Sequence, residues 1–255
     1  DLAQADAIVV TLVDPTVPYA ETVKLLKRHQ VWRSHRDRVF VFDTGSSPAG
    51  LFPGLYTSLR RSLFSAARHR TSGYLRSFNE FIDEQPRDPR PPLLLSFQGN
   101  FTSRPRRLLF ELNLDRPDVL IERTEPFWQR IGSPDSRDFK KDYALTIARS
   151  RFVLCPRGIG VSSFRLFETM QSARVPVIIS DAWVPSAKID WDAFSLRIPE
   201  RDVHRVVEIC EAEDATWADR AALARRAWEE WFSPVGLSHL LVDAIEDIPI
   251  GRAHV

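Results

Sequence analysis

The chain has 255 residues, of which 44% are hydrophobic and 27% charged, enough for a substantial hydrophobic core in one or two domains. Its formal net charge of +1 excludes a strong overall field, so neither nucleic acid nor an anionic membrane is expected as a general partner. No apolar run approaches the roughly 18 residues of a transmembrane helix, and we expect no membrane span.

The cysteine and histidine content also narrows the class of protein. Two cysteines, Cys155 and Cys210, are too few for a disulfide framework, which indicates a reducing compartment. We therefore expect a cytoplasmic location, with attachment to the periphery of a membrane left open. The chain begins at Asp1 without a basic and apolar leader, so we expect a trimmed sequence. No Cys or His pair has zinc-ligand spacing, and we expect no metal site.

Residues 1–88 are interpreted as one α/β unit. An apolar strand over residues 7–13 is followed by a helix over residues 19–30 and a second strand over residues 38–42. Both strands end in turn-forming residues, Asp14-Pro15 after the first and Asp43-Thr44-Gly45 after the second.

A linker is predicted at residues 84–92, which contain four prolines, and residues 89–255 form a second unit. There, strands and helices alternate, which indicates a parallel sheet covered by helices on both faces. The strands are expected at 93–97, 119–121, 151–155, 175–180 and 194–198, and the helices near 104–112, 138–150, 164–173, 216–232 and 237–245.

The segment from Arg151 to Asp181 predicts a binding site. It combines a buried strand, a loop with Gly158 and Gly160, a helix and a second buried strand, and ligands bind beyond the carboxyl ends of such strands. The two glycines would let backbone amides approach a ligand, and the helix would begin at Ser162 or Ser163.

The free amides at this helix start suit a phosphate group. Arg157 and Arg165 flank the start and would each present a guanidinium fork to a diphosphate. Glu168, in the second helical turn, would accept hydrogen bonds from the ribose hydroxyls. From these residues alone, a surface pair of Arg165 with Glu168 on an ordinary strand–loop–helix is an equal alternative.

The same segment resembles the exostosin family of glycosyltransferases, GT47. The similarity runs through Cys155-Pro156-Arg157-Gly158, Ser163-Phe164-Arg165, Glu168, Val175 to Asp181, Trp183, Ile189-Asp190-Trp191 and Phe194-Ser195. A weaker similarity lies at Leu95 to Gly99, where Gln98 stands at the position of an arginine that is common in the family.

The resemblance implies an α/β fold of the GT-B kind, with two Rossmann-like domains. The N-terminal, acceptor-side domain would be abbreviated to residues 1–88, and residues 89–255 would bind the donor. It further implies an inverting, metal-independent transfer from a UDP-sugar to a glycan or other hydroxyl acceptor, with no cofactor. The family's hetero-complexes leave a protein partner or an oligomer open.

In such a reaction, protein cations must stabilise the departing diphosphate. We assign this role to Arg157, Arg165 and the helix amides. The further donor-binding residues that we expect are Gln98, Gly99, Arg104, Gly158, Ser162, Ser163 and Glu168. Arg104 is preferred to Arg106 and Arg107, although a solvated helix face is the favoured interpretation of all three arginines.

The catalytic base should come from the opposite side of the cleft. Asp43 is the preferred candidate because it lies at the end of a strand, and Asp14 and His35 are the other two. A simple turn-forming role is the alternative for the aspartates.

Two other functions remain open at this stage. The chain could be a nucleotide-sugar-binding module without catalysis, or a non-catalytic partner subunit of an active glycosyltransferase. The tryptophans of the late helix, Trp217, Trp228 and Trp231, are interpreted as core or domain-bridging residues.

Overall fold

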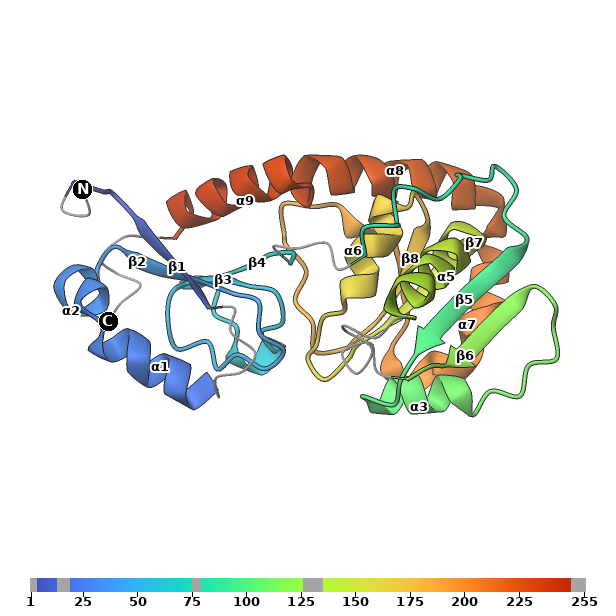
Figure 1. The fold of residues 1–255 in the computed structure, drawn as a ribbon, viewed down its shortest axis with the longest axis horizontal. Coiled ribbons are helices and arrows are strands. Elements are labelled where there is room, and N and C mark those ends of the chain that lie inside the picture. Colours follow the sequence, from blue (N-terminus) through green and yellow to red (C-terminus); the bar gives the residue numbers. More distant parts are fainter. Residues whose placement is uncertain (1–3, 13–18, 75–78, 126–134, 249–255) are drawn as a thin grey trace.

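The protein contains two parallel β-sheets placed end to end and joined on one side by a long pair of helices (Figure 1). A computed structural model describes residues 4–12, 19–74, 79–125 and 135–248. The candidate base Asp14 lies outside these residues. The prediction of two Rossmann-like α/β units is confirmed, and the two sheets lie on either side of the proline-rich segment at residues 84–92.

The first sheet has the strand order β1-β2-β3-β4, with all neighbours parallel. Its strands are β1 (Ile8–Leu12), β2 (Val39–Asp43), β3 (Gly54–Tyr56) and β4 (His69–Thr71). The single helix expected at residues 19–30 is instead two helices, α1 (Tyr19–Arg28) and α2 (Gln30–His35). The side chain of His29 accepts a hydrogen bond from the amide of Val31 and begins α2, which explains the break. No prediction had covered β3 and β4, because three-residue strands carry almost no periodic signal.

The second sheet has the order β6-β5-β7-β8-β9, again parallel throughout. Its strands are β5 (Leu93–Gly99), β6 (Val119–Arg123), β7 (Ser150–Pro156), β8 (Val175–Ile179) and β9 (Leu196–Arg197). The helices are α3 (Arg104–Phe110), α5 (Ser136–Ala148), α6 (Phe164–Gln171), α7 (Val206–Ala212), α8 (Trp217–Trp231) and α9 (Pro234–Glu246). Every strand predicted for this unit is present, and among the described residues α7 is the one α-helix of this unit that had not been predicted.

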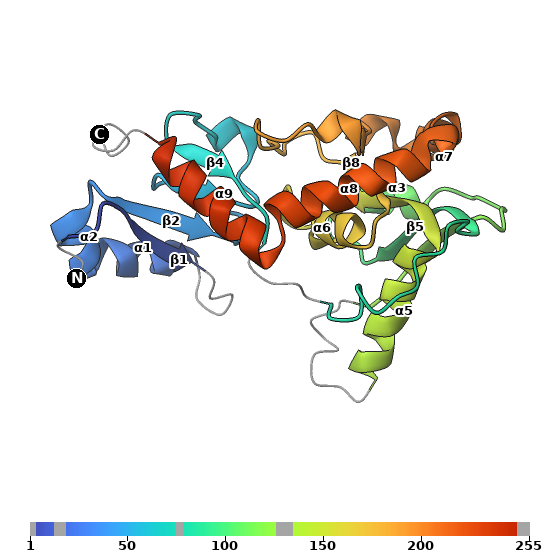
Figure 2. The same ribbon diagram turned by 90° about the horizontal axis from the view of Figure 1, so that it is seen from above.

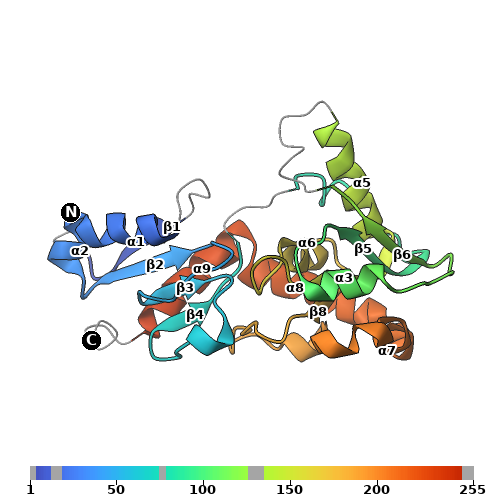
Figure 3. The same cartoon turned by 90° about the horizontal axis from the view of Figure 1, so that it is seen from below.

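Alternating side chains of β7 pack against two layers of helices. Phe152 and Leu154 face the core with α3 and α7, whereas Val153 faces α5 and Cys155 faces α6. Figures 2 and 3 show α5 and α7 on opposite sides of this sheet. The expected doubly covered sheet is therefore present, because a strand that is buried on both faces needs helices on both.

The first sheet obtains its second helical layer from the far end of the chain. Helix α1 covers one face through Val23 and Leu26, and α9 covers the other face through Leu237 and Leu240 (Figure 1). A serine at position 233 caps α9 by accepting a hydrogen bond from the amide of Gly236, at 3.1 Å. The unit proposed as residues 1–88 is thus completed by a helix from beyond the linker.

One hydrophobic core joins the two sheets. Phe40 and Leu55 of the first sheet share a buried cluster with Ile178 of the second and with Trp183 and Trp191. Trp228 and Trp231 of α8 pack against this cluster, which agrees with their interpretation as core or bridging residues. The two sheets are consequently held in contact by apolar burial as well as by the chain.

The two halves of the protein approach each other closely at Gly160. A Cβ atom added there would lie 2.2 Å from the carbonyl oxygen of Ser46 and 2.2 Å from the hydroxyl of Ser58. The Ser58 hydroxyl accepts hydrogen bonds from the amides of Val161 and Ser162, at 2.9 and 3.2 Å. Gly160 thus makes room for the other half of the protein. It also lines the cavity described below, and the approach of its backbone amide to a ligand stays a prediction.

This contact gives a prediction on stability. Gly160→Ala forces the backbone of residue 46 away and should lower the free energy of unfolding by about 1–3 kcal/mol, measured by urea denaturation. Gly158→Ala is the matched control, because its Cβ would meet its nearest neighbour, Arg106 Nη2, at an ordinary 3.5 Å. Equal stability of the two variants would contradict this account of the interface.

Candidate functional site

A cavity of about 360 Å³ lies where the carboxyl ends of both sheets meet. The second sheet contributes the ends of β5 and β6 and the loop after β7, and the first contributes Ser46 after β2 and Tyr74 after β4. The position agrees with the rule that ligands of parallel sheets bind beyond the carboxyl ends of the strands. Seven of the predicted site residues line it: Gln98, Gly99, Gly158, Ser162, Ser163, Arg165 and Glu168.

Three predicted residues do not line this cavity. Arg104 is exposed on α3 and points elsewhere. The Nε of Arg157 donates to Glu200 at 2.8 Å, in an ion pair outside the cavity. Asp43 is 1% exposed and enclosed at the end of β2. The prediction that Arg157 and Arg165 face a shared cavity is therefore not met by the arrangement of these side chains.

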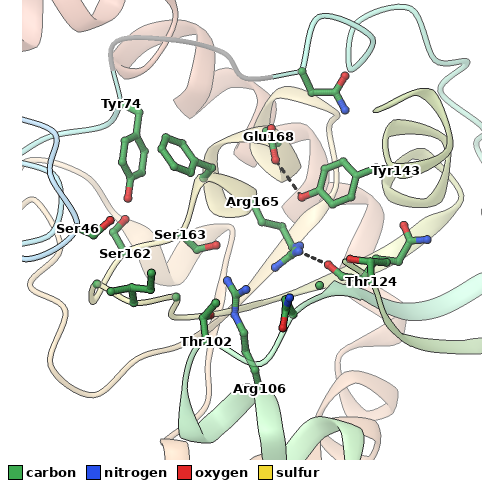
Figure 4. A pocket seen from close by; sticks show the side chains of 18 of the residues that line it. Ser46, Tyr74, Thr102, Arg106, Thr124, Tyr143, Ser162, Ser163, Arg165 and Glu168 are labelled. Carbon is green, nitrogen blue, oxygen red and sulfur yellow. Dashed lines mark hydrogen bonds between the residues drawn. The ribbon is translucent and has the colours of Figure 1, made fainter. Parts of the chain in front are cut away.

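Arg106 occupies the place that we had expected for Arg157 (Figure 4). Its Nε donates to the carbonyl of Arg157 at 3.0 Å, which directs the rest of the guanidinium toward the cavity. The preference for Arg104 within the group 104–107 fails because of helical geometry: residues two apart face different sides of α3.

Arg165 lies on the first turn of α6 and is 7% exposed. Its Nη2 donates to the carbonyl of Gln98, and its Cζ lies 4.6 Å from the centre of the Phe97 ring. Its Nη1 is buried and has no hydrogen-bond partner among the described residues. Arg106 lies against the same ring, with its Cζ 5.6 Å from the centre, so both cations contact Phe97.

Two neighbouring guanidinium groups thus share a confined space. Burial, with repulsion from Arg165, lowers the pKa of Arg106 to about 9, which still leaves it charged near neutral pH. Within the part of the chain that the structure describes, neither arginine forms an ion pair with a carboxylate. A bound anion would relieve this repulsion, so the arrangement is suited to a group with two negative charges.

The start of α6 lies beside these cations. Ser163 is the N-cap residue, but its side chain makes no capping hydrogen bond, and both Ser162 and Ser163 line the cavity. The choice between these two serines as the helix start is therefore decided in favour of Ser163. The helix dipole adds a partial positive charge at the same place.

Glu168 lies one turn further along α6 and is 8% exposed. Its Oε2 accepts a hydrogen bond from the hydroxyl of Tyr143, at 2.9 Å (Figure 4). Burial raises the pKa of Glu168, and the hydrogen bond from Tyr143 and the charge of Arg165 partly oppose this. The interpretation of Arg165 and Glu168 as a solvated surface pair is wrong, because both side chains are buried at the cavity.

The sequence did not indicate several of the lining residues. Tyr143 and Phe139 come from one face of α5, and Tyr74 stacks on Phe164 with ring centres 3.7 Å apart. The i, i+4 spacing of the α5 pair was the available signal, but the same spacing also suits ordinary core residues. Thr102 and Thr124 follow β5 and β6, where the loops carry no recognisable pattern.

Comparison with known proteins places this site in a family. The profile described as the Exostosin GT47 domain matches residues 63–212, which is more than half of the chain. The chain belongs to the exostosin family. The matched residues include α3, α5 and α6 and thus most of the cavity, as well as Trp183 and Trp191 of the joint core.

Individual relatives are matched by the chain over only part of their length. It is 31% identical to Exostosin-1 of Drosophila melanogaster over 160 residues, which cover 56% of this chain and 21% of that protein. It is 34% identical to Exostosin-1a of Danio rerio over 191 residues, 68% of this chain and 25% of that one. This exostosin domain therefore spans about a fifth to a quarter of these relatives.

Among solved structures, the chain is similar to Anabaena HepE, crystallised in complex with UDP and glucose. The two are 11% identical, with a TM-score of 0.47 over 94% of this chain and 71% of that one. The GT-B arrangement expected for the exostosin domain rests on its own two parallel sheets, which face each other across the cavity.

Two further features bear on partners. None of the helices in the described ranges is long and apolar enough to cross a membrane. In the same ranges, no three His, Cys, Asp or Glu side chains are grouped as metal ligands would be. Metal independence remains a prediction.

The cavity yields a prediction on anion binding. Arg106→Ala should weaken binding of inorganic pyrophosphate by roughly 1.5–3 kcal/mol, because a charged hydrogen-bond donor that lines the cavity is lost. Arg104→Ala, on the exposed side of the same helix, should leave the affinity unchanged. Isothermal titration calorimetry distinguishes the two, and equal losses in both variants would show that only the overall charge of α3 matters.

Proposed function

We propose that this exostosin domain transfers a sugar from a UDP-sugar to a hydroxyl acceptor, with inversion and without a metal ion. The observation that carries the proposal is the pair of cations beside the start of α6, the half-buried Arg106 and the buried Arg165. They would neutralise the diphosphate as it departs, which is the step where charge accumulates. The family membership supports the same chemistry.

Glu168 and the polar groups around it would hold the nucleoside. Its Oε1 would accept a hydrogen bond from a ribose hydroxyl, as acidic residues do in other nucleotide sites. The transferred sugar would then lie on the side of the first sheet, near Ser46 and Tyr74. The acceptor would reach the donor from that side as well.

In the transfer step, the acceptor oxygen forms a bond to the anomeric carbon while the bond from that carbon to the phosphate oxygen breaks. The electron pair of the broken bond leaves with the diphosphate, where the two arginines would stabilise it. The proton of the acceptor hydroxyl must pass to a base. Asp43 and His35 are the described candidates, and neither lines the cavity.

A second function is favoured by that same observation. If no base can approach the acceptor hydroxyl, this exostosin domain would bind a nucleotide sugar without transferring it, either alone or as the partner subunit of an active enzyme. Hydrolysis and transfer assays with a panel of UDP-sugars separate the two functions. Binding without turnover, with activity appearing only in a complex with a second transferase, would favour the partner role.

Donor binding can be tested at α6. Arg165→Ala and Glu168→Ala should each weaken UDP binding by roughly 1–3 kcal/mol in calorimetry, because each removes a hydrogen bond that involves a charged group. Arg151→Ala is the control: this arginine pairs with Asp214 outside the cavity and should leave the UDP affinity unchanged. Wild-type affinity in both α6 variants would mean that these side chains are structural.

The assignment of Asp43 as base gives a separate prediction. Burial raises the pKa of Asp43 to about 6, despite the hydrogen bond from the amide of Gly45. Turnover should therefore fall as the pH decreases through about 6 and the carboxylate takes up a proton. Asp43→Asn should abolish transfer while UDP binding persists. Wild-type turnover in this variant would remove Asp43 as a candidate.

A further inference from the structure

Tyr143 connects helix α5 to the polar end of the cavity. Its hydroxyl donates to Glu168 Oε2 at 2.9 Å, and the Cζ of Arg165 lies 5.5 Å from the centre of its ring. In Figure 4 the hydroxyl of Tyr143 points at the carboxylate of Glu168. One tyrosine thus contacts both charged side chains of α6 that line the site.

The hydrogen bond from Tyr143 is the one that the Glu168 carboxylate accepts within the described ranges. The titratable groups that face this carboxylate are Arg165 on α6, Lys140 and Tyr143 on α5, and Cys155 on β7. Lys140 Nζ forms an ion pair with Glu80 at 2.8 Å, and Cys155 is a buried thiol. Tyr143 therefore supplies the direct contact that favours the ionised carboxylate.

We propose that Tyr143 is a positioning residue that keeps Glu168 ionised and presents its free oxygen to a ligand hydroxyl. With Oε2 occupied by the phenol, Oε1 is left as an acceptor toward the cavity. A ligand that lacks a hydroxyl there would leave a buried carboxylate oxygen without a partner, which disfavours binding strongly. The site would select ribonucleotides over deoxyribonucleotides.

That this ligand hydroxyl belongs to a ribose rests on the proposed function. The coupling between Tyr143 and Glu168 does not depend on the proposed function. The two parts can therefore be tested apart. Tyr143→Phe removes the hydroxyl and keeps the ring that contacts Arg165. Tyr56→Phe is the matched control, since the hydroxyl of Tyr56 donates to the carbonyl of Phe52, just before β3, at 2.7 Å and away from the cavity.

The first measurement uses the protein without ligand. The Glu168 carboxyl is followed by ¹³C NMR as a function of pH, and its signal is assigned by its absence in Glu168→Gln. Burial raises the pKa of Glu168 and the Tyr143 hydrogen bond lowers it, so Tyr143→Phe should shift the titration to higher pH. Tyr56→Phe should leave it in place. An unchanged titration in Tyr143→Phe would overturn the proposal.

The second measurement compares the affinities of UDP, 2′-deoxy-UDP and 3′-deoxy-UDP across the same pH range. Wild type should bind at least one deoxy analogue about tenfold or more weakly than UDP while Glu168 is ionised. As the pH falls, Tyr143→Phe should lose this preference at a higher pH than wild type does, because the pKa of Glu168 is higher in the variant. Tyr56→Phe should keep the wild-type preference and pH profile.

The two measurements fail in different ways. A wild-type protein that does not bind UDP would contradict the proposed function. The NMR titration would still test the coupling between Tyr143 and Glu168, because it uses the protein without ligand. If UDP and both deoxy analogues bind with equal affinity, Glu168 does not recognise the ribose hydroxyls, and this part of the proposal is overturned. Loss of affinity in Tyr143→Phe with no change in pH profile or preference would reduce Tyr143 to a structural residue.

Discussion

The close approach of the two sheets at Gly160 is the constraint on which the site depends. The hydroxyl of Ser58 reaches the amides of the loop after β7 because no side chain lies between them. This contact sets the first sheet against the start of α6 and gives the cavity its second wall. Helix α9 reinforces the arrangement from the other side by covering the sheet whose strand β3 leads into Ser58.

The electrostatics of the cavity follow from this enclosure. Two guanidinium groups are held near one aromatic ring by bonds to backbone carbonyls and not by carboxylates. Burying like charges together costs free energy, and an anion recovers that cost when it binds. The negative charge in the same cavity is one helical turn away, where Tyr143 contacts Glu168. The site therefore has a cationic end and an anionic end, in keeping with a ligand that carries phosphates and hydroxyl groups.

The residues that carry the family resemblance divide into two groups. Gly158, Arg165 and Glu168 line the cavity, whereas Trp183 and Trp191 pack edge to face in the joint core, with ring centres 5.0 Å apart. Gly160, beside them in the chain, serves the contact between the sheets. The residues of this family motif thus serve two purposes: some line the cavity, and others form the core that holds the cavity residues in place.

The amino-acid sequence by itself determined the local structure: the second sheet's strands and most of its helices, the loop after β7 and the residues of α6 that reach the cavity. These follow from short-range patterns of apolar residues, glycines and caps, which depend on neighbours a few positions away. The tertiary structure alone decided that Arg106 faces the site while Arg157 pairs with Glu200, that Asp43 is enclosed, and that α9 returns to the first sheet. Those outcomes depend on contacts between residues far apart in the chain, and no local periodicity encodes them.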